Sequence, residues 1–505
     1  MTVEPQPSSK PAHESAQEHK PAYEYFSDDP SFPTRRVIGV MFVGAFLGYL
    51  NETLLNVALT SFMQEFGVDK TTVQWMATGF LLVMGALAPL TASLVQWVPT
   101  RRLTLLTLAT FLAGSLICAM APSFWVLLAG RLVQALSGAL TMPLLMNATL
   151  AIYPPNRRGK VMGMVAMVFS VAPALGPTLS GLIVDHLGWR WLFLLTMPFV
   201  LVSMGLVWRY LKVDIIDITR PRIDALSVLL SVAGFGGLVF IGSSFSDMPV
   251  AQAVLVAVAS VLLILAFALR QFRLRTPLLN LRAFGYPQYA FAVIVLASNV
   301  FLFLGMELLL PMYAQQVLML SATVTGLILL PGSIVQALLL PAFGTLLDRR
   351  GGRFVVLPGA VLMLVTLVVM WMSITPSAHA VWLATLFTLF SMAGAATMTS
   401  ETVGLNGVPR EMNPHGAAIM STLMPIAGAL GAAFFVGITH LGEALWGRGG
   451  TAMAGSGYTV MTEAARASML DGLQLAFGLA PLFALLMVWA AFRFPRDPAP
   501  GGSGH

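Results

Sequence analysis

Residues 341–354 read PAFGTLLDRRGGRF, and residues 89–102 read PLTASLVQWVPTRR. The two stretches are 252 residues apart. At this offset Pro89 matches Pro341, and Arg101 matches Arg353. A chain that repeats itself over this distance contains two related halves. Such repeats are common in membrane transporters, whose substrate and ion sites lie between the repeats.

The composition excludes a water-soluble fold. Of 505 residues, 57% are hydrophobic and 10% charged, and the mean hydropathy is +0.81. Soluble domains carry roughly 25% charged residues. An ordinary cytosolic enzyme, a disordered scaffold and a nucleic-acid binder are therefore excluded, despite the pI of 9.6. The one cysteine, Cys118, rules out an internal disulfide framework.

Fourteen apolar stretches separate a polar start and a polar end of the chain. Each is about as long as a membrane-spanning helix, which needs about 20 apolar residues. The stretches lie near 37–60, 74–97, 102–120, 124–149, 160–184, 190–211, 222–243, 249–270, 289–315, 322–346, 353–374, 380–404, 415–440 and 469–492.

Positive charge predicts the orientation. If both termini face the cytoplasm, 23 of the 28 Lys and Arg residues fall on that side. The other side receives Lys70, Arg190, Arg448 and Arg466, while Arg131 lies within a span. Since cytoplasmic loops of membrane proteins are rich in Lys and Arg, this split favours cytoplasmic termini.

The predicted fold is an all-α membrane protein with fourteen transmembrane helices, arranged as two six-helix halves plus two extra linker helices. The expected divisions are a disordered cytoplasmic tail (1–35), an N-terminal half (36–211), linkers with the two extra helices (212–287), a C-terminal half (288–493) and a second cytoplasmic tail (494–505).

Three motifs carry a family resemblance. They are VAPALGPTLSGLIVDHLGWRWLF (171–193), RLVQALSGAL (131–140) and LNETLLNVAL (50–59). The chain resembles the 14-helix drug:proton antiporter branch of the major facilitator superfamily over about residues 36–493. The resemblance implies the major facilitator fold and assigns Gly176, Pro177 and Gly181 to the antiporter motif.

The resemblance also implies a cytoplasmic gate. The family's loop motif is intact in the second half, where it includes Asp348, Arg349 and Arg353, and it is eroded in the first half. Simple anchoring by positive charge does not account for Asp348. On the first helix, Asn51 occupies the place of the family's acid and Glu52 follows it, so the proton site is displaced by one residue.

Acids within spans are costly and rare, and they indicate function. Glu52 shares one helix face with Gly44, Gly48 and Asn56, because these residues recur at intervals of four. We interpret Glu52 as a proton site. The alternative is a packing seam that holds a neutral, hydrogen-bonded acid.

Glu307 lies at an equivalent place in the second half, 255 residues after Glu52. It shares a helix face with Asn299, Phe303 and Pro311, and the proline favours a bend. We interpret Glu307 as a site for a proton or a cation. The alternative is a structural hydrogen bond at the bend.

Arg131 lies about as deep in its span as Glu52, judged by the rise of about 1.5 Å per residue. An ion pair or a water-bridged pair would hold the carboxyl ionised until the two groups separate, which is a plausible proton switch. A static brace between helices is the alternative. Glu401, in contrast, ends a polar run near the end of its helix and is expected to be solvated at the membrane interface.

Further polar and aromatic side chains within the spans are candidates for a substrate cavity. They are Asn51, Asn56, Gln134, Asn299, Phe303 and Gln336. No ATP-binding loop, His-Glu-x-x-His or Cys-x-x-Cys motif occurs, so the sequence predicts no enzyme, no metal and no cofactor besides the coupling protons.

The resemblance implies a monomeric, proton-coupled antiporter of the inner (cytoplasmic) membrane that exports hydrophobic or cationic drugs by alternating access. Its partners would be these small molecules and the bilayer, with no nucleic acid. A dedicated exporter of one metabolite, peptide or lipid-like compound is an open alternative on the same fold, and a periplasmic adaptor is compatible with either. A membrane-embedded enzyme or sensor would act without solute flux.

Overall fold

The computed structural model describes residues 25–495 except 31, 69, 213, 216–217, 219–223, 245–249, 275–276 and 447–462. Helices make up nearly all of this part, and each of the fourteen predicted stretches falls on one helix or on a pair of consecutive helices. Among the described residues, ten helical segments are long and apolar enough to cross a membrane, and a segment bent by 41° between Gly85 and Pro89 makes an eleventh. The all-α membrane fold is confirmed.

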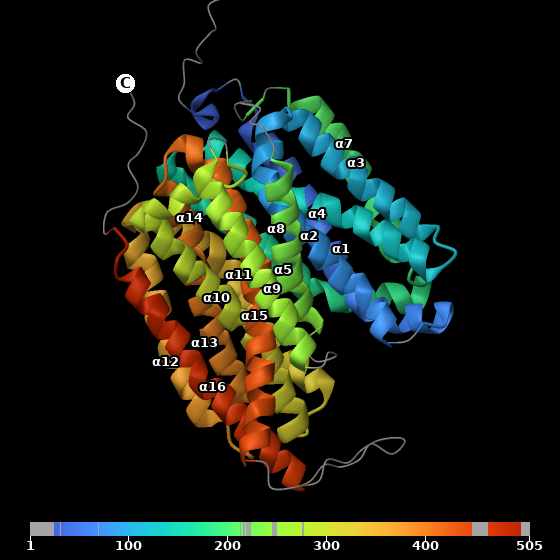
Figure 1. Cartoon of the computed structure of the whole chain (residues 1–505), viewed down its shortest axis with the longest axis vertical. Coiled ribbons are helices and arrows are strands. Elements are labelled where there is room, and N and C mark those ends of the chain that lie inside the picture. Colours follow the sequence, from blue (N-terminus) through green and yellow to red (C-terminus); the bar gives the residue numbers. More distant parts are fainter. Residues whose placement is uncertain are drawn as a thin grey trace, which may run out of the picture.

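The helices form two bundles with a hairpin between them (Figure 1). The N-terminal bundle contains α1 (Thr34–Phe66), α2 (Lys70–Trp97), α3 (Thr100–Ala119), α4 (Phe124–Ile152), α5 (Pro155–Leu187), α6 (Trp191–Leu194) and α7 (Thr196–Tyr210). The hairpin consists of α8 (Ala225–Ser244) and α9 (Val250–Arg273). The C-terminal bundle contains α10 (Pro287–Met312), α11 (Ala322–Arg350), α12 (Gly352–Ser373), α13 (Ala380–Met398), α14 (Ser400–Asn406), α15 (Asn413–Trp446) and α16 (Glu463–Ala491).

Local chemistry explains several helix ends. Gly67 ends α1 with a φ of 63°, which glycine adopts without steric cost. Ser321 caps α11, because its side chain accepts a hydrogen bond from the Val324 amide. Pro311 lies inside α10, which ends at Met312 and continues as a short π-helix, Tyr313–Val317, so the bend expected at Pro311 stays a prediction.

Both ends of the described chain lie at one end of the molecule, here called the terminal end. The Arg353 amide donates to the carbonyl of Pro495. The ring of Tyr25 lies beneath the guanidinium groups of Arg158 and Arg410. Tyr25 is buried and precedes a 3-10 turn, Phe26–Asp28, so this part of the predicted N-terminal tail is folded.

The two bundles meet along two seams, one between α5 and α11 and one between α2 and α15. The hairpin covers the second seam, because α8 contacts both α2 and α15. At the opposite end, called the far end, α1 and α16 are well separated in Figure 1. The bundles are therefore closed against each other at the terminal end.

Candidate functional site

A polar network surrounds Arg131 in the N-terminal bundle. The Arg131 side chain is 2% exposed, and its Nη1 donates to Asn51 Oδ1 of α1 at 3.1 Å and to Gln134 Oε1 at 3.2 Å. Gln134 Nε2 in turn donates to Ser115 Oγ of α3 at 2.8 Å. The guanidinium carbon lies 3.9 Å from the centre of the Phe80 ring on α2, a cation–π distance. This Arg131 network joins four helices.

Two glycines let the network form. A Cβ on Gly114 of α3 would lie 2.6 Å from Gln134 Cγ and 2.8 Å from the Gly130 carbonyl oxygen of α4. A Cβ on Gly130 would lie 2.7 Å from Cys118 Sγ. These distances are too short for real side chains, so α3 and α4 approach closely only because both residues lack one. The close approach places Gln134 within hydrogen-bonding reach of Ser115.

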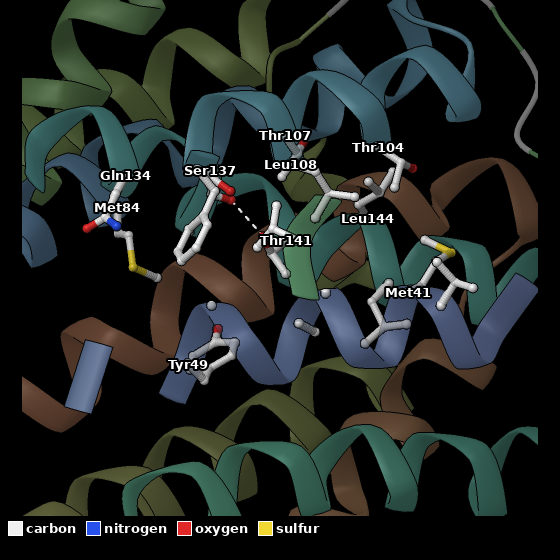
Figure 2. A pocket seen from close by; sticks show the side chains of 18 of the residues that line it. Met41, Tyr49, Met84, Thr104, Thr107, Leu108, Gln134, Ser137, Thr141 and Leu144 are labelled. Carbon is white, nitrogen blue, oxygen red and sulfur yellow. Dashed lines mark hydrogen bonds between the residues drawn. The ribbon is translucent and has the colours of Figure 1, made fainter. Parts of the chain in front are cut away.

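A small apolar cavity of about 40 Å3 adjoins the network, and Gln134 belongs to both (Figure 2). Three threonine hydroxyl groups of the cavity wall already have hydrogen-bond acceptors. Thr104, Thr107 and Thr141 donate to carbonyl oxygens one turn earlier in their own helices. The remaining lining is mostly apolar, from α1, α2, α3, α4 and α7. The predicted glycine face of α1 borders the cavity through Gly44 and Gly48, whereas the threonines of α3 were not predicted to line a cavity.

Three of the predicted cavity residues come together in the C-terminal bundle. Asn299 Oδ1, Phe303 Cδ2 and Gln336 Nε2 lie 3.6, 3.6 and 3.8 Å from the place of a Cβ on Gly394. We call this set the Gly394 cluster. Asn299 and Gln336 are buried, and Asn299 Oδ1 has no hydrogen-bond partner among the described residues. The cluster therefore offers an unused acceptor on α10.

Aromatic rings cover one side of the Gly394 cluster. Phe303 stacks on Phe390 of α13 with ring centres 5.8 Å apart, and Phe387 lies 6.4 Å from Phe303. Glu307 follows Phe303 by one turn of α10, and the residue is not packed into the core of its bundle. A carboxyl within a span thus lies one turn from an aromatic and amide-lined cluster, which suits proton exchange and cation recognition.

At the terminal end, Asp348 of α11 joins the two bundles. Its Oδ1 accepts from the Gly159 amide of α5 at 2.7 Å, and its Oδ2 accepts from the Lys160 amide at 2.9 Å. The backbones of Gly159 and Gly344 touch here, so closely that a Cβ on either would overlap the other residue. Asp348 is therefore a direct link between the bundles.

The other two predicted gate residues do not join this link. Arg349 is exposed, and the Arg353 guanidinium lies 4.0 Å from the centre of the Phe492 ring in its own bundle. Asp348 takes part in none of the ion pairs seen among the described residues, which include Asp28–Arg157, Glu65–Arg190 and Asp224–Arg270.

The sequence did not indicate a second link, between Arg158 and Asn406. Arg158 is buried, and its Nη1 donates to Asn406 Oδ1 of α14 at 3.0 Å. Asn406 Nδ2 donates back to the Pro155 carbonyl at 3.3 Å. We call this link, together with Asp348 and the Gly159–Gly344 contact, the terminal gate.

One prediction fails at this end of the molecule. Glu401 was expected at the membrane interface, but its side chain is 3% exposed and Oε1 has no hydrogen-bond partner among the described residues. Its position near the end of the polar run is as predicted, but α10 and α15 pack over α14 and exclude the interface. Burial by neighbouring helices is not visible in the local sequence.

Five predicted residues cannot be compared in the same way. Glu52 and Asn56 lie in α1, and Gly176, Pro177 and Gly181 lie in α5, but the surroundings of all five fall outside the described part of the structure. Their roles stay predictions.

A multi-pass helical protein with two linked bundles, each carrying buried polar groups, has the architecture of a membrane transporter rather than of an enzyme. Residues 41–432 match the family described as Major Facilitator Superfamily. The chain belongs to this superfamily.

Two curated relatives come from Bacillus subtilis (strain 168). The chain is 39% identical to the "Lincomycin resistance protein LmrB" over 412 residues, which cover 80% of this chain and 85% of that protein. It is 35% identical to the "Uncharacterized MFS-type transporter YcnB" over 470 residues, covering 92% and 96%. The "Multidrug resistance protein B homolog" of Mycobacterium tuberculosis (strain CDC 1551 / Oshkosh) is 28% identical over 428 residues, covering 81% and 77%.

Among solved structures, the human organic anion transporter MFSD10 (TETRAN) is similar with a TM-score of 0.62 and 17% sequence identity. The similarity covers 91% of this chain and 99% of that one. At this identity the similarity supports the fold alone.

Proposed function

We propose that the protein is a proton-coupled antiporter that exports hydrophobic or cationic drugs. The observation that carries the proposal is Glu307, an acid within an apolar span, one turn from the aromatic and amide groups of the Gly394 cluster. The relatives named for lincomycin resistance and multidrug resistance support a drug as the substrate. The Arg131 network supplies a second polar centre in the other bundle.

The proposed mechanism uses the terminal gate. While the gate is closed, the bundles separate at the far end, and Glu307 exchanges its proton with that side. When the bundles rock, the terminal end opens and the far end closes, so a drug and a proton compete for the same carboxyl from the other side. Drug leaves as a proton enters, because a carboxylate that binds a cation must first lose its proton.

We further propose that the terminal end faces the cytoplasm. Arg101, Arg102, Arg157 and Arg158 begin helices at this end, and Arg349 ends one there. This is the asymmetry expected of a cytoplasmic face. A monomer suffices for the mechanism, because each bundle contributes its own polar centre.

A vesicle assay tests the proposal. Purified protein in vesicles with a pH gradient should move a cationic dye such as ethidium, or lincomycin, and should move protons in the opposite direction. Glu307→Gln and Glu52→Gln should each abolish coupled movement, because neither amide titrates. Glu463→Gln, at an exposed acid that begins α16, is the matched control. Full coupled efflux by both Glu307→Gln and Glu52→Gln would reject the assignment.

A second candidate is a dedicated exporter of one compound on the same fold. The unpartnered Asn299 Oδ1 beside Gln336 favours it, since a buried acceptor is suited to directional recognition. Binding measurements across chemically unrelated dyes discriminate between the two candidates: broad binding supports drug export, and binding of a single chemical class supports the dedicated exporter.

A further inference from the structure

Glu401 is a buried acid that the proposed transport cycle does not use. It lies in α14, a seven-residue helix set off from α13 by a break at Thr399. Oε1 is buried without a hydrogen-bond partner, and no ion pair of the described residues includes this carboxyl. An isolated carboxylate is very costly to bury, so a group in this place is stable only with its proton bound.

The elements packed against α14 provide no cation for Glu401. They are α10, α15, α5 and α12. Tyr289 of α10 lies near enough to Glu401 for their charges to interact, and its hydroxyl donates to the Gly416 carbonyl. The other titratable and charged groups at this end of these elements are Arg157, Arg158, Lys160, Arg353 and His415.

Most of these groups have partners elsewhere. Arg157 pairs with Asp28, and Arg353 lies over Phe492. Arg158 donates to Asn406 and to the carbonyls of Leu150 and Tyr153. The Lys160 side chain is exposed, and the His415 ring bonds to the backbone of Leu278. Among the described residues, no charged group of these elements therefore forms an ion pair with Glu401 while the bundles are closed.

The short helix connects Glu401 to the terminal gate. Asn406 ends α14 and makes both bonds of the Arg158–Asn406 link across to α5. When the bundles separate at the terminal end, this link must break and the α5 side of α14 is exposed to water. Water then replaces the protein around the carboxyl and stabilises its ionised form.

We propose that Glu401 is a proton-binding site that controls the terminal gate: the closed gate holds the proton on Glu401, and the open gate releases it. In the balanced step, the neutral carboxyl transfers its proton to a water molecule and becomes a carboxylate, and gate closure reverses the transfer. Acidification at the terminal end therefore favours the closed gate. The inference rests on the proposed alternating access, but not on which substrate is exported or on coupled proton flux.

The test measures the gate directly. Nitroxide labels on Arg102→Cys and Phe354→Cys, both exposed at the terminal end on opposite bundles, report the distance between the bundles by pulsed electron paramagnetic resonance. Cys118→Ala removes the one native thiol. Spectra of the purified full chain in lipid nanodiscs are compared from pH 5 to pH 9. Glu401→Gln is the test variant, and Glu411→Gln, at an exposed acid nearby, is its matched control.

One proton released per opening raises the ratio of open to closed protein by up to tenfold per pH unit. We expect this slope in the parent and in Glu411→Gln and its loss in Glu401→Gln. A parent without a slope, or an equal slope in Glu401→Gln, overturns the proposal. Should Glu401→Gln fail to fold, Glu401→Asp must keep the slope and shift its midpoint, and an unchanged midpoint overturns the proposal. Failure of the vesicle assay leaves this distance measurement unaffected, so the two proposals fail separately.

Discussion

At the residue scale, Arg131 is a buried cation that links helices of the N-terminal bundle. Two amide oxygens and an aromatic face surround the guanidinium. A buried cation responds strongly to any nearby change in charge, because the interior screens charge weakly. This sensitivity is what a coupling residue needs, and it does not require the residue to move far.

We predict that Arg131→Ala lowers the free energy of unfolding by about 1–3 kcal/mol, because the amides of Asn51 and Gln134 lose their partner in a buried place. Thermal unfolding in detergent measures the change, and Arg102→Ala, at an exposed position, should alter it little. Transport separates the two interpretations of Arg131. Loss of transport beyond the loss of folded protein supports coupling, whereas transport proportional to folded protein supports a static brace.

At the element scale, the contact between α3 and α4 depends on Gly114 and Gly130. Replacing an exposed glycine in a helix with alanine usually stabilises the protein, by roughly 0.5–1 kcal/mol. At Gly114 the added Cβ would instead lie 2.8 Å from the backbone nitrogen of Gln134, which cannot rotate away as a side chain can.

We predict that Gly114→Ala destabilises the protein by about 1–3 kcal/mol through overpacking and lowers transport, because it forces Gln134 away from Ser115. Gly205→Ala on α7 is the control, since nothing lies within 4 Å of its Cβ position. Relative to the parent, the melting temperature should fall in Gly114→Ala and rise in Gly205→Ala. A Gly114→Ala protein as stable as Gly205→Ala would contradict this account of the helix contact.

The hairpin is fastened by an ion pair next to α8. Arg270 Nε and Nη2 donate to the two carboxylate oxygens of Asp224, at 2.6 and 2.9 Å, and the Ser227 hydroxyl donates to the same carboxylate. Arg270, followed by Ser227, holds the pKa of Asp224 well below its usual range. A lowered pKa contributes stability above the pKa of an unfolded Asp, about 3.9, and loses it as pH falls through the folded value.

We therefore predict that Asp224→Asn lowers the melting temperature by about 1–2 °C, and by the same amount throughout pH 5–8. The difference from the parent should shrink only in strong acid, where the Asp224 carboxylate itself binds a proton. Scanning fluorimetry at several pH values provides the measurement. Asp28→Asn removes a more exposed pair, with Arg157, and should change the melting temperature less. A difference that grew on acidification from pH 8 to pH 5 would contradict the sign of the shift.

At the scale of the whole molecule, the terminal gate relies on backbone contact between the bundles. The α-carbon of Gly344 lies so close to the Gly159 carbonyl that α5 and α11 cannot both keep their places if either residue carries a side chain. A substitution at Gly344 therefore acts on the relation between bundles rather than on one helix.

We predict that Gly344→Ala shifts the protein toward the open terminal end, by at least tenfold in the ratio of open to closed forms. The nitroxide distances between Arg102→Cys and Phe354→Cys measure the shift. Gly326→Ala on the same helix, with no atom within 4 Å of its Cβ position, should leave the distances unchanged. Identical distances in the two variants would show that the gate does not depend on this contact.

The sequence predicted what depends on local composition and missed what depends on how helices face one another. Apolar length placed all fourteen helical stretches, and spacing of four placed Asn299 and Phe303 on one face. The hydrogen bond from Arg131 to Asn51 was not predictable, because the sequence does not show which face of α1 meets α4. The burial of Glu401 was also not predictable, because the helices that cover it, α10 and α15, are separate segments of the chain.

The hairpin also makes the molecule asymmetric toward its lipid. α8 lies over the seam between α2 and α15, where Trp75 stacks on Phe240 at 5.9 Å. The exposed leucines and valines of α9 form the outer surface of the hairpin. The hairpin therefore separates acyl chains from the α2–α15 seam, whereas the described residues of α8 and α9 do not cover the α5–α11 seam. Changes in bilayer thickness or lateral pressure act on a rocking protein from one flank, and rocking is resisted unequally on its two sides.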